Sequence, residues 1–173
     1  MPQLIFALGV VYILTNRVAQ GIAECEQALS LDPNFADAHG MIGWGKVLIG
    51  QASETEGHVR EALRLSPRDI FAFRWLAFVG IAKLQLGAEV EAVAWLRRSI
   101  EANRNFPLAH FNLGAALALL GRSDEGEVAV QAGLRLHPAF TVRRFLSTLS
   151  DPADPAGRER VAKGMRMAGV PEG

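Results

Sequence analysis

The stretch Ala28–Gly43, ALSLDPNFADAHGMIG, has a counterpart 34 residues further on in Ala62–Ala77, ALRLSPRDIFAFRWLA. Both stretches place Ala-Leu ahead of a proline and an apolar run after it, so that Pro33 and Pro67 also lie 34 residues apart. A fixed period of this length is typical of chains built from stacked copies of one small structural unit. The period therefore decides the fold class.

Extending the period along the chain gives four units, 2–35, 36–69, 73–106 and 107–140, with three extra residues, 70–72, between the second and third. Each position within the unit keeps one kind of residue. The eighth position holds Gly9, Gly43, Gly80 and Gly114, and the twentieth holds Gly21, Thr55, Ala92 and Gly126. The turn position holds Asn16, Gly50, Gly87 and Gly121, and the closing position holds Pro33, Pro67, Arg104 and Pro138.

These preferences predict two antiparallel helices in each unit. Small residues at the eighth and twentieth positions let the two helices approach closely. A glycine within a helix costs about 1 kcal/mol relative to alanine, so four at one position indicate a packing requirement. Glycine or asparagine at the turn tolerates the left-handed conformation that ends a helix, and the closing proline stops the second helix.

The pattern resembles the tetratricopeptide repeat (TPR) family, in which a bulky residue, Leu-Gly, an aromatic, two small or aromatic positions and a proline recur. The first unit shows Ile5, Leu8, Gly9, Tyr12, Gly21, Cys25 and Pro33 at these steps. The departures are Lys46 and Lys83 at an aromatic position and Arg104 for proline. The resemblance implies an all-α, right-handed α-α superhelix of four helix-turn-helix repeats.

The residues after the fourth unit no longer follow the period. TVRRFLSTLS predicts a short helix, DPADP a break, and AGRERVAKGMRMAG a final helix that ends at Gly169. We expect residues 141–173 to form capping helices, because the last unit of a solenoid needs a polar outer face. Stretches such as NFPLAHFNLGAALALLGR and GMRMAGVPEG also resemble the C-terminal TPR tails of bacterial class III adenylate cyclases and related signalling regulators.

Charge and composition favour a protein partner. The 18 basic and 18 acidic side chains cancel, which argues against nucleic acid or an anionic membrane as the partner. The uncharged opening run, LIFALGVVYILTN, is too short to cross a bilayer and has no basic segment before it, so we interpret it as the first helix of the first repeat. A single cysteine, Cys25, fits a reducing compartment, and the expected location is the cytoplasm.

In the TPR family, the first helices of the repeats line a concave groove that binds partners, and the resemblance carries this role to matching positions here. The resulting groove is mostly apolar, and we expect it to bind an amphipathic helix or an apolar segment. A family-type clamp for a terminal carboxylate is disfavoured, because only Arg74 and Asn112 offer suitable side chains. The predicted partner-binding residues are Phe6, Val10, Met41, Trp44, Arg74, Phe78, Ile81, Phe111 and Asn112.

The leading hypothesis is thus a non-enzymatic protein-interaction module, regulatory or scaffolding, within a bacterial signalling system. The alternative is a homodimer formed through the groove or through the exposed first repeat. A small enzyme or nucleotide binder is the third hypothesis. No catalytic residue, cofactor or metal site is predicted, because the histidines lack metal-ligand spacing and no phosphate-binding loop is complete.

Overall fold

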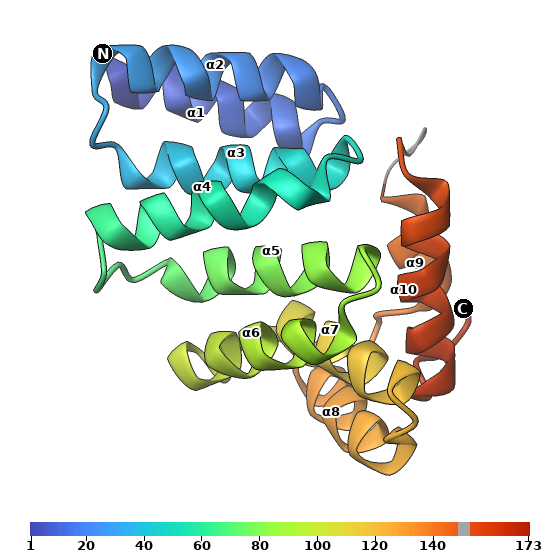
Figure 1. Ribbon diagram of the computed structural model, residues 1–173. Helices are drawn as coiled ribbons and strands as arrows, with labels where there is room; N and C mark the ends of the chain where they lie inside the picture. The colour runs from blue at the N-terminus through green and yellow to red at the C-terminus, as the bar shows by residue number, and fades with distance from the viewer. Residues whose placement is uncertain (149–152) are drawn as a thin grey trace.

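The computed structural model describes residues 1–148 and 153–173, and in these ranges the chain forms helices and no strand (Figure 1). The prediction of an all-α fold is confirmed. The helices are α1 (Pro2–Leu14), α2 (Val18–Leu31), α3 (Ala36–Leu48), α4 (Ala52–Leu65), α5 (Ala72–Gln85), α6 (Glu89–Ala102), α7 (Pro107–Leu119), α8 (Ser123–Leu136), α9 (Val142–Ser147) and α10 (Pro155–Met167).

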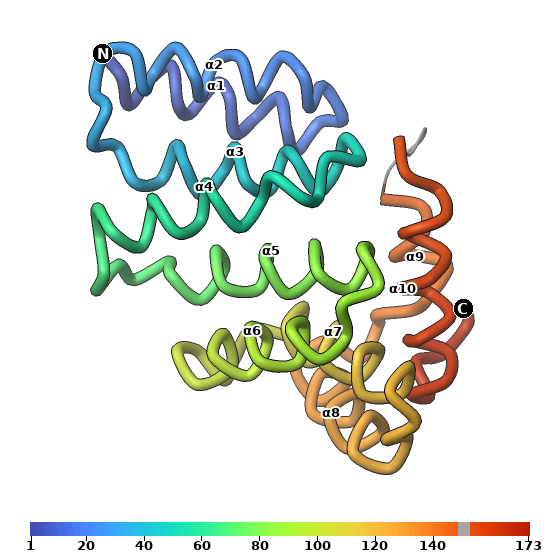
Figure 2. Tube along the Cα trace, viewed as in Figure 1, coloured from blue at the N-terminus to red at the C-terminus, as the bar shows by residue number. Residues whose placement is uncertain are grey.

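The first eight helices form four antiparallel pairs (Figure 2). In the first and fourth pairs the two helices approach closely at small residues. A Cβ atom on Gly9 would lie 2.9 Å from both the Gly21 carbonyl oxygen and the Cys25 Sγ. In the fourth pair, a Cβ on Gly114 would lie 2.9 Å from the carbonyl oxygen of Gly126. The expected close approach at the eighth and twentieth positions is therefore confirmed.

The turns within the pairs adopt the left-handed conformation that the sequence predicts. Asn16 has φ of 62°, and Gly50, Gly87 and Gly121 have φ of 76°, 75° and 78°. The residue after each turn then donates its backbone N–H to the preceding helix; for example, Arg122 donates to the Leu117 carbonyl oxygen at 2.9 Å. This pattern satisfies carbonyl groups that the end of a helix leaves without a partner.

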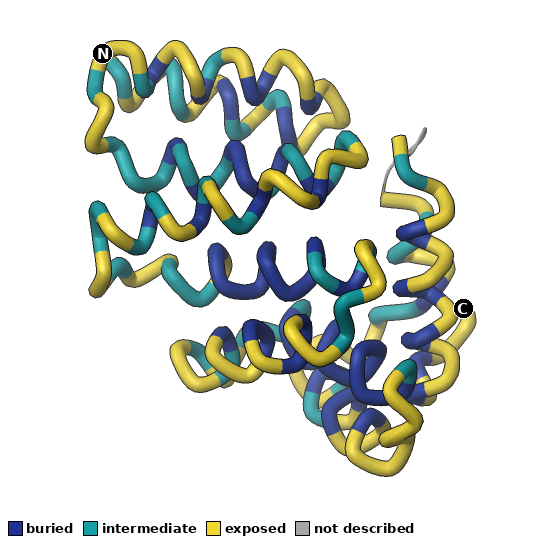
Figure 3. Tube along the Cα trace, in the orientation of Figure 1, coloured by how far each residue is buried: buried dark blue, intermediate teal, exposed yellow. Residues whose placement is uncertain are grey.

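Neighbouring pairs stack so that burial is greatest in the later part of the chain. Every residue of α7 from Ala109 to Ala118 is buried, whereas α1 buries only Gly9 and Ile13 (Figure 3). Cys25 lies fully inside the first pair, and burial raises the pKa of its thiol to about 12. This cysteine is therefore a core residue.

The first helices lie on the inner side of the curved stack. Contacts join α1 to α3, α3 to α5 and α5 to α7, whereas each second helix contacts mainly its own pair and the first helix that follows. This arrangement leaves the second helices on the outer side. The positions that the resemblance assigns to a groove are therefore carried by the inner helices.

The C-terminal tail, residues 141–173, does not continue the stack of helix pairs. α10 packs along α7, reaches α5, and lies beside α9, which places it against inner helices (Figure 1). The expected polar cap is thus displaced towards the inner side of the curve. The physical reason is the apolar face of α10, where Val161, Ala162 and Met165 are fully buried. The break expected at DPADP begins within residues 149–152, which lie outside the described residues.

Gly114→Ala should lower the free energy of unfolding, measured by urea denaturation, by up to about 2 kcal/mol. The added methyl would meet Val130 Cγ2 at 2.6 Å and a backbone oxygen at 2.9 Å, and such overpacking costs about 1–3 kcal/mol against a gain in helix propensity of about 1 kcal/mol.

The matched control is Gly57→Ala on α4, where a Cβ would meet nothing within 4 Å. It should stabilise the protein by about 0.5–1 kcal/mol. Equal effects of the two substitutions would contradict the packing explanation.

Candidate functional site: an apolar pocket beside the inner helices

A pocket of about 520 Å³ opens between the inner helices and the C-terminal tail. Its volume falls within the range of about 300–1,000 Å³ that is common for binding pockets. Three groups of residues contribute its walls. They are Ile13, Leu14, Asn16, Trp44 and Leu48 from the first two pairs, Pro107, Leu108 and Phe111 from α7, and His137, Phe140, Arg144, Phe145, Thr148 and Arg158 from the end of α8 onwards.

Aromatic stacking holds two of these walls together. The ring of Phe111 on α7 lies 3.9 Å from that of Phe140, with an interplanar angle of 12°. The ring of Trp44 stacks on Phe78 of α5, with centroids 4.7 Å apart. Each stacked pair of rings joins two different elements. Tertiary packing therefore holds Trp44 and Phe111 in place at the pocket.

The tail contributes the positive charge of the pocket. The guanidinium of Arg158 is buried over the Phe145 ring, and its Nη2 donates to the Phe145 carbonyl oxygen at 2.7 Å and to Thr148 Oγ1 at 3.0 Å. Burial lowers the pKa of Arg158. Arg144 is exposed, and its Nη1 donates to the Ala139 carbonyl oxygen at 2.8 Å.

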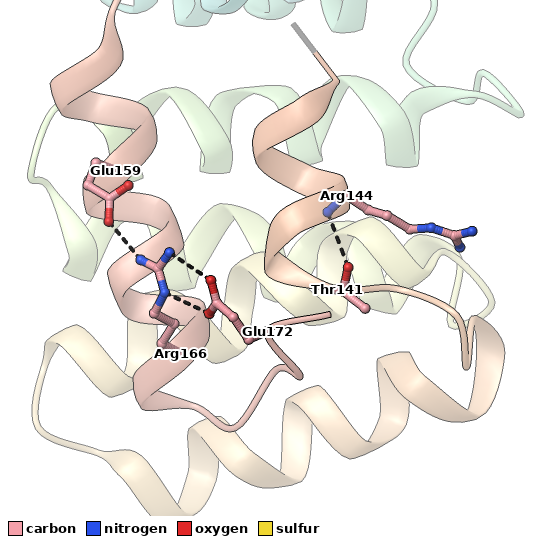
Figure 4. A network of polar contacts seen from close by, with 5 residues as sticks. All are labelled: Thr141, Arg144, Glu159, Arg166 and Glu172. Carbon is pink, nitrogen blue, oxygen red and sulfur yellow. Dashed lines mark hydrogen bonds and ion pairs between the residues drawn. The ribbon is translucent and has the colours of Figure 1, made fainter.

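Ion pairs link residues within the tail and also attach α10 to α6. Arg166 Nη1 lies 2.7 Å from Glu159, and its Nε lies 2.9 Å from Glu172 (Figure 4). These two carboxylates raise the pKa of Arg166. Arg160 of α10 pairs with Glu89 of α6. The tail wall of the pocket is thus anchored at several points.

The C-terminal residues also cap α9. Val142 donates its backbone N–H to the Pro171 carbonyl oxygen at 2.9 Å, and the Arg144 N–H donates to Thr141 Oγ1 at 3.1 Å (Figure 4). These contacts occupy N–H groups at the start of α9 that would otherwise have no partner within the helix. The end of the chain therefore helps to position Arg144 and Phe145.

The structure brings only part of the predicted groove set into this pocket. Trp44 and Phe111 line it, and so does Ile13, which also lies on an inner helix. Phe78 and Ile81 are buried in contacts between helices, and Asn112 is fully buried with its Nδ2 donating to the Leu108 carbonyl oxygen at 2.8 Å. These last three side chains lie outside the pocket lining, whereas Phe111 lines the pocket although it is itself only 1% exposed.

The other predicted residues lie outside the pocket lining. Phe6 is half-buried against Phe35, with ring centroids 4.8 Å apart, and Met41 packs at the edge of the same apolar cluster. Arg74 is exposed, with its guanidinium 4.9 Å from the Phe71 ring. Val10 is half-buried. Whether these residues contact a partner stays a prediction.

Several pocket residues were missed in the sequence. Leu14 and Leu48 share the thirteenth position of the repeat, and Leu108 occupies the second, so the same family pattern that assigned Trp44 also points to them. The tail residues, by contrast, follow no period. No repeat-based signal could place Phe145 or Arg158 against α1 and α3.

Two histidines that seemed unrelated in the sequence lie together. The rings of His39 on α3 and His58 on α4 are 6.0 Å apart, and burial lowers the pKa of both. Within residues 1–148 and 153–173, no group of three or more His, Cys, Asp or Glu side chains is arranged to hold a metal ion. We therefore assign no chemistry to this pair.

With this geometry in view, comparisons support a tetratricopeptide-repeat fold. Residues 2–35 match the sequence profile of the tetratricopeptide repeat. The solved structure of TTC0263, a thermophilic TPR protein of Thermus thermophilus, is similar with a TM-score of 0.70 and 20% identity over 95% of this chain and 88% of that one. The structure of YrrB, described as a TPR protein with an unusual peptide-binding site, gives a TM-score of 0.61 and 22% identity, covering 95% of this chain and 82% of that one.

One curated relative matches part of the chain. A cell division cycle protein 27 homolog of Caenorhabditis elegans is 30% identical over 102 residues, which is 59% of this chain. The chain spans about 13% of the length of that protein. TPR proteins typically mediate protein–protein interactions and are typically not enzymes. Among the described helices, none combines the length and the apolar character needed to cross a membrane.

A larger residue at Gly164 should loosen the packing of α10 against α7. A Cβ at Gly164 of α10 would lie 2.7 Å from the Ala115 carbonyl oxygen of α7. Gly164→Val should therefore speed hydrogen exchange in α9 and α10 by roughly tenfold, because overpacking costs about 1–3 kcal/mol, while α1 to α4 exchange as before.

Lys163→Val is the control, since Lys163 is exposed on the same helix. Mass spectrometry of exchanged peptides provides the measurement. Similar exchange in the tail of both variants would show that α10 does not depend on its contact with α7.

Proposed function

We propose that the chain is a protein-interaction module that binds an apolar segment of a partner protein in the pocket between its inner helices and its tail. The observation that carries the proposal is the cluster of apolar side chains around an open volume of about 520 Å³. Among them, the Leu14 side chain is 71% exposed although it is large and apolar. A partner that covered Leu14 would gain hydrophobic free energy without unfolding the repeats.

The position of α10 supports the kind of segment that we propose. Its apolar face already covers part of the inner surface, with Val161 and Met165 fully buried beside α7. The inner surface of this chain thus packs against one amphipathic helix within its own structure. A partner segment with similar apolar spacing would extend that packing from the tail towards α1 and α3.

The wider role is part of the same proposal. The tail resembles the TPR regions of bacterial class III adenylate cyclases, and on this basis we place the module in a cytoplasmic bacterial signalling system as a regulatory or scaffolding part without enzymatic activity. The single, buried thiol of Cys25 is compatible with a reducing compartment.

A second candidate is self-association through α1. Leu4, Leu8 and Val11 have four- and three-residue spacing, which places them on one face of the helix, and they are 68%, 41% and 53% exposed. α1 has no charged residue from Pro2 to Leu14, so two copies could meet without like-charge repulsion. This face is the specific observation that favours a homodimer.

A matched pair of variants on α1 separates the two candidates. Leu14→Ser should weaken binding of peptides selected against the wild-type chain from a random display library by about tenfold or more, because burial of a leucine contributes about 1.5–3 kcal/mol. Leu4→Ser, which changes a leucine of similar exposure outside the pocket, should leave that binding unchanged. Fluorescence anisotropy with labelled peptides measures both.

Sedimentation equilibrium of the same variants completes the test. A wild-type dimer that Leu4→Ser dissociates, together with peptide binding that Leu14→Ser does not affect, would replace the pocket proposal with the self-association candidate.

A further inference from the structure

The charges around the pocket are all of one sign. Its described lining contains the guanidinium groups of Arg144 and Arg158, and it contains no carboxylate. Both arginines belong to the tail, on the side opposite α1 and α3. A ligand that fills the apolar volume therefore meets positive charge on one side only.

The described contacts of these arginines are with neutral oxygen atoms. Arg158 donates to the Phe145 and Leu146 carbonyl oxygens and to Thr148 Oγ1, and Arg144 donates to the Ala139 carbonyl oxygen. Hydrogen bonds between a guanidinium and a carboxylate are stronger than bonds to neutral acceptors, because both groups are charged.

Resting on the proposed function, we propose that the pocket binds a short partner segment in which bulky apolar side chains are followed or preceded by an aspartate or glutamate, and that Arg144 receives this carboxylate. The apolar side chains enter between Leu14, Leu48 and Leu108. The carboxylate then lies at the tail wall, where Arg158 adds a second positive charge. The charge of the tail thereby selects the direction in which the segment lies.

The size and rim of the pocket fit a peptide segment. An α-helix with side chains is about 10–12 Å across, so one turn occupies on the order of 500 Å³. The pocket, at about 520 Å³, therefore has room for a segment of about one helical turn and not for a long helix. Asn16 and His137 also lie at its lining and offer hydrogen-bonding groups to a peptide backbone, which a simple alkyl chain would not use.

Selection from a random peptide display library on the full chain tests the proposal. The expected peptides combine at least two bulky apolar residues with Asp or Glu within four positions of them. Their affinity, measured by fluorescence anisotropy, should fall about tenfold in Arg144→Gln, since removal of a charged partner has an effect of this order. Arg143→Gln is the matched control, because Arg143 is exposed on the same helix and lies outside the pocket lining.

A double substitution makes the contact specific. Changing the peptide carboxylate to its amide should weaken binding to the wild-type chain about tenfold and have little effect on Arg144→Gln, if the two groups meet. Circular dichroism melting curves of each variant should match the wild type, so that a loss of affinity is not a loss of folding.

The outcomes separate this inference from the proposed function. Apolar peptides without acidic residues, whose binding depends on Leu14 but not on Arg144, would overturn the carboxylate proposal and leave the pocket proposal in place. Failure to select any peptide would overturn both. Binding of dodecanoate at this pocket in the absence of peptide binding would also overturn the proposal, because the ligand would then be an amphiphile and not a protein segment.

Discussion

The close approach of two helices within each pair is the constraint on which the rest of the structure depends. Gly9 meets Gly21 and Gly114 meets Gly126 at distances that leave no room for a side chain. With the helices this close, one side of each pair is used for internal packing and the remaining apolar side chains point towards neighbouring pairs. Stacking the pairs then buries apolar clusters that span neighbouring pairs, which no single pair could form alone.

The pocket follows from this stacking and from the placement of the tail. The inner helices present Leu14, Leu48 and Leu108, while α10 packs along α7 and α9 lies beside α10, so that Phe145 and two arginines complete the lining. The apolar walls and the positive charge therefore come from different parts of the chain. A partner segment with apolar and acidic side chains is complementary to these apolar walls and this positive charge. The tail is therefore part of the proposed binding surface.

The repeat period was enough to predict the helices, the left-handed turns and the small residues between paired helices, because each depends on local geometry that recurs every 34 residues. Trp44 and Phe111 could be assigned to the inner surface for the same reason. Phe78, Ile81 and Asn112 share that assignment but lie outside the pocket lining, since packing between neighbouring pairs is decided by side-chain shape and not by the period.

The tail was the part that sequence reasoning could not place. Its final helix was expected to cap the stack, and the structure places α10 against α7, where Gly164 lies close to Ala115. The close packing of a glycine against a distant helix leaves no periodic signal. The place of Arg144 and Arg158 beside the pocket is therefore visible only in the three-dimensional structure.

Hydrogen-exchange footprinting of the full chain with a selected peptide tests the central claim most directly. We expect protection in the last turns of α1 and α3, the first turns of α7, and α9, because these segments surround the pocket. Protection confined to the outer helices α2, α4, α6 and α8, or the absence of any protection by a peptide bound at saturation, would contradict it.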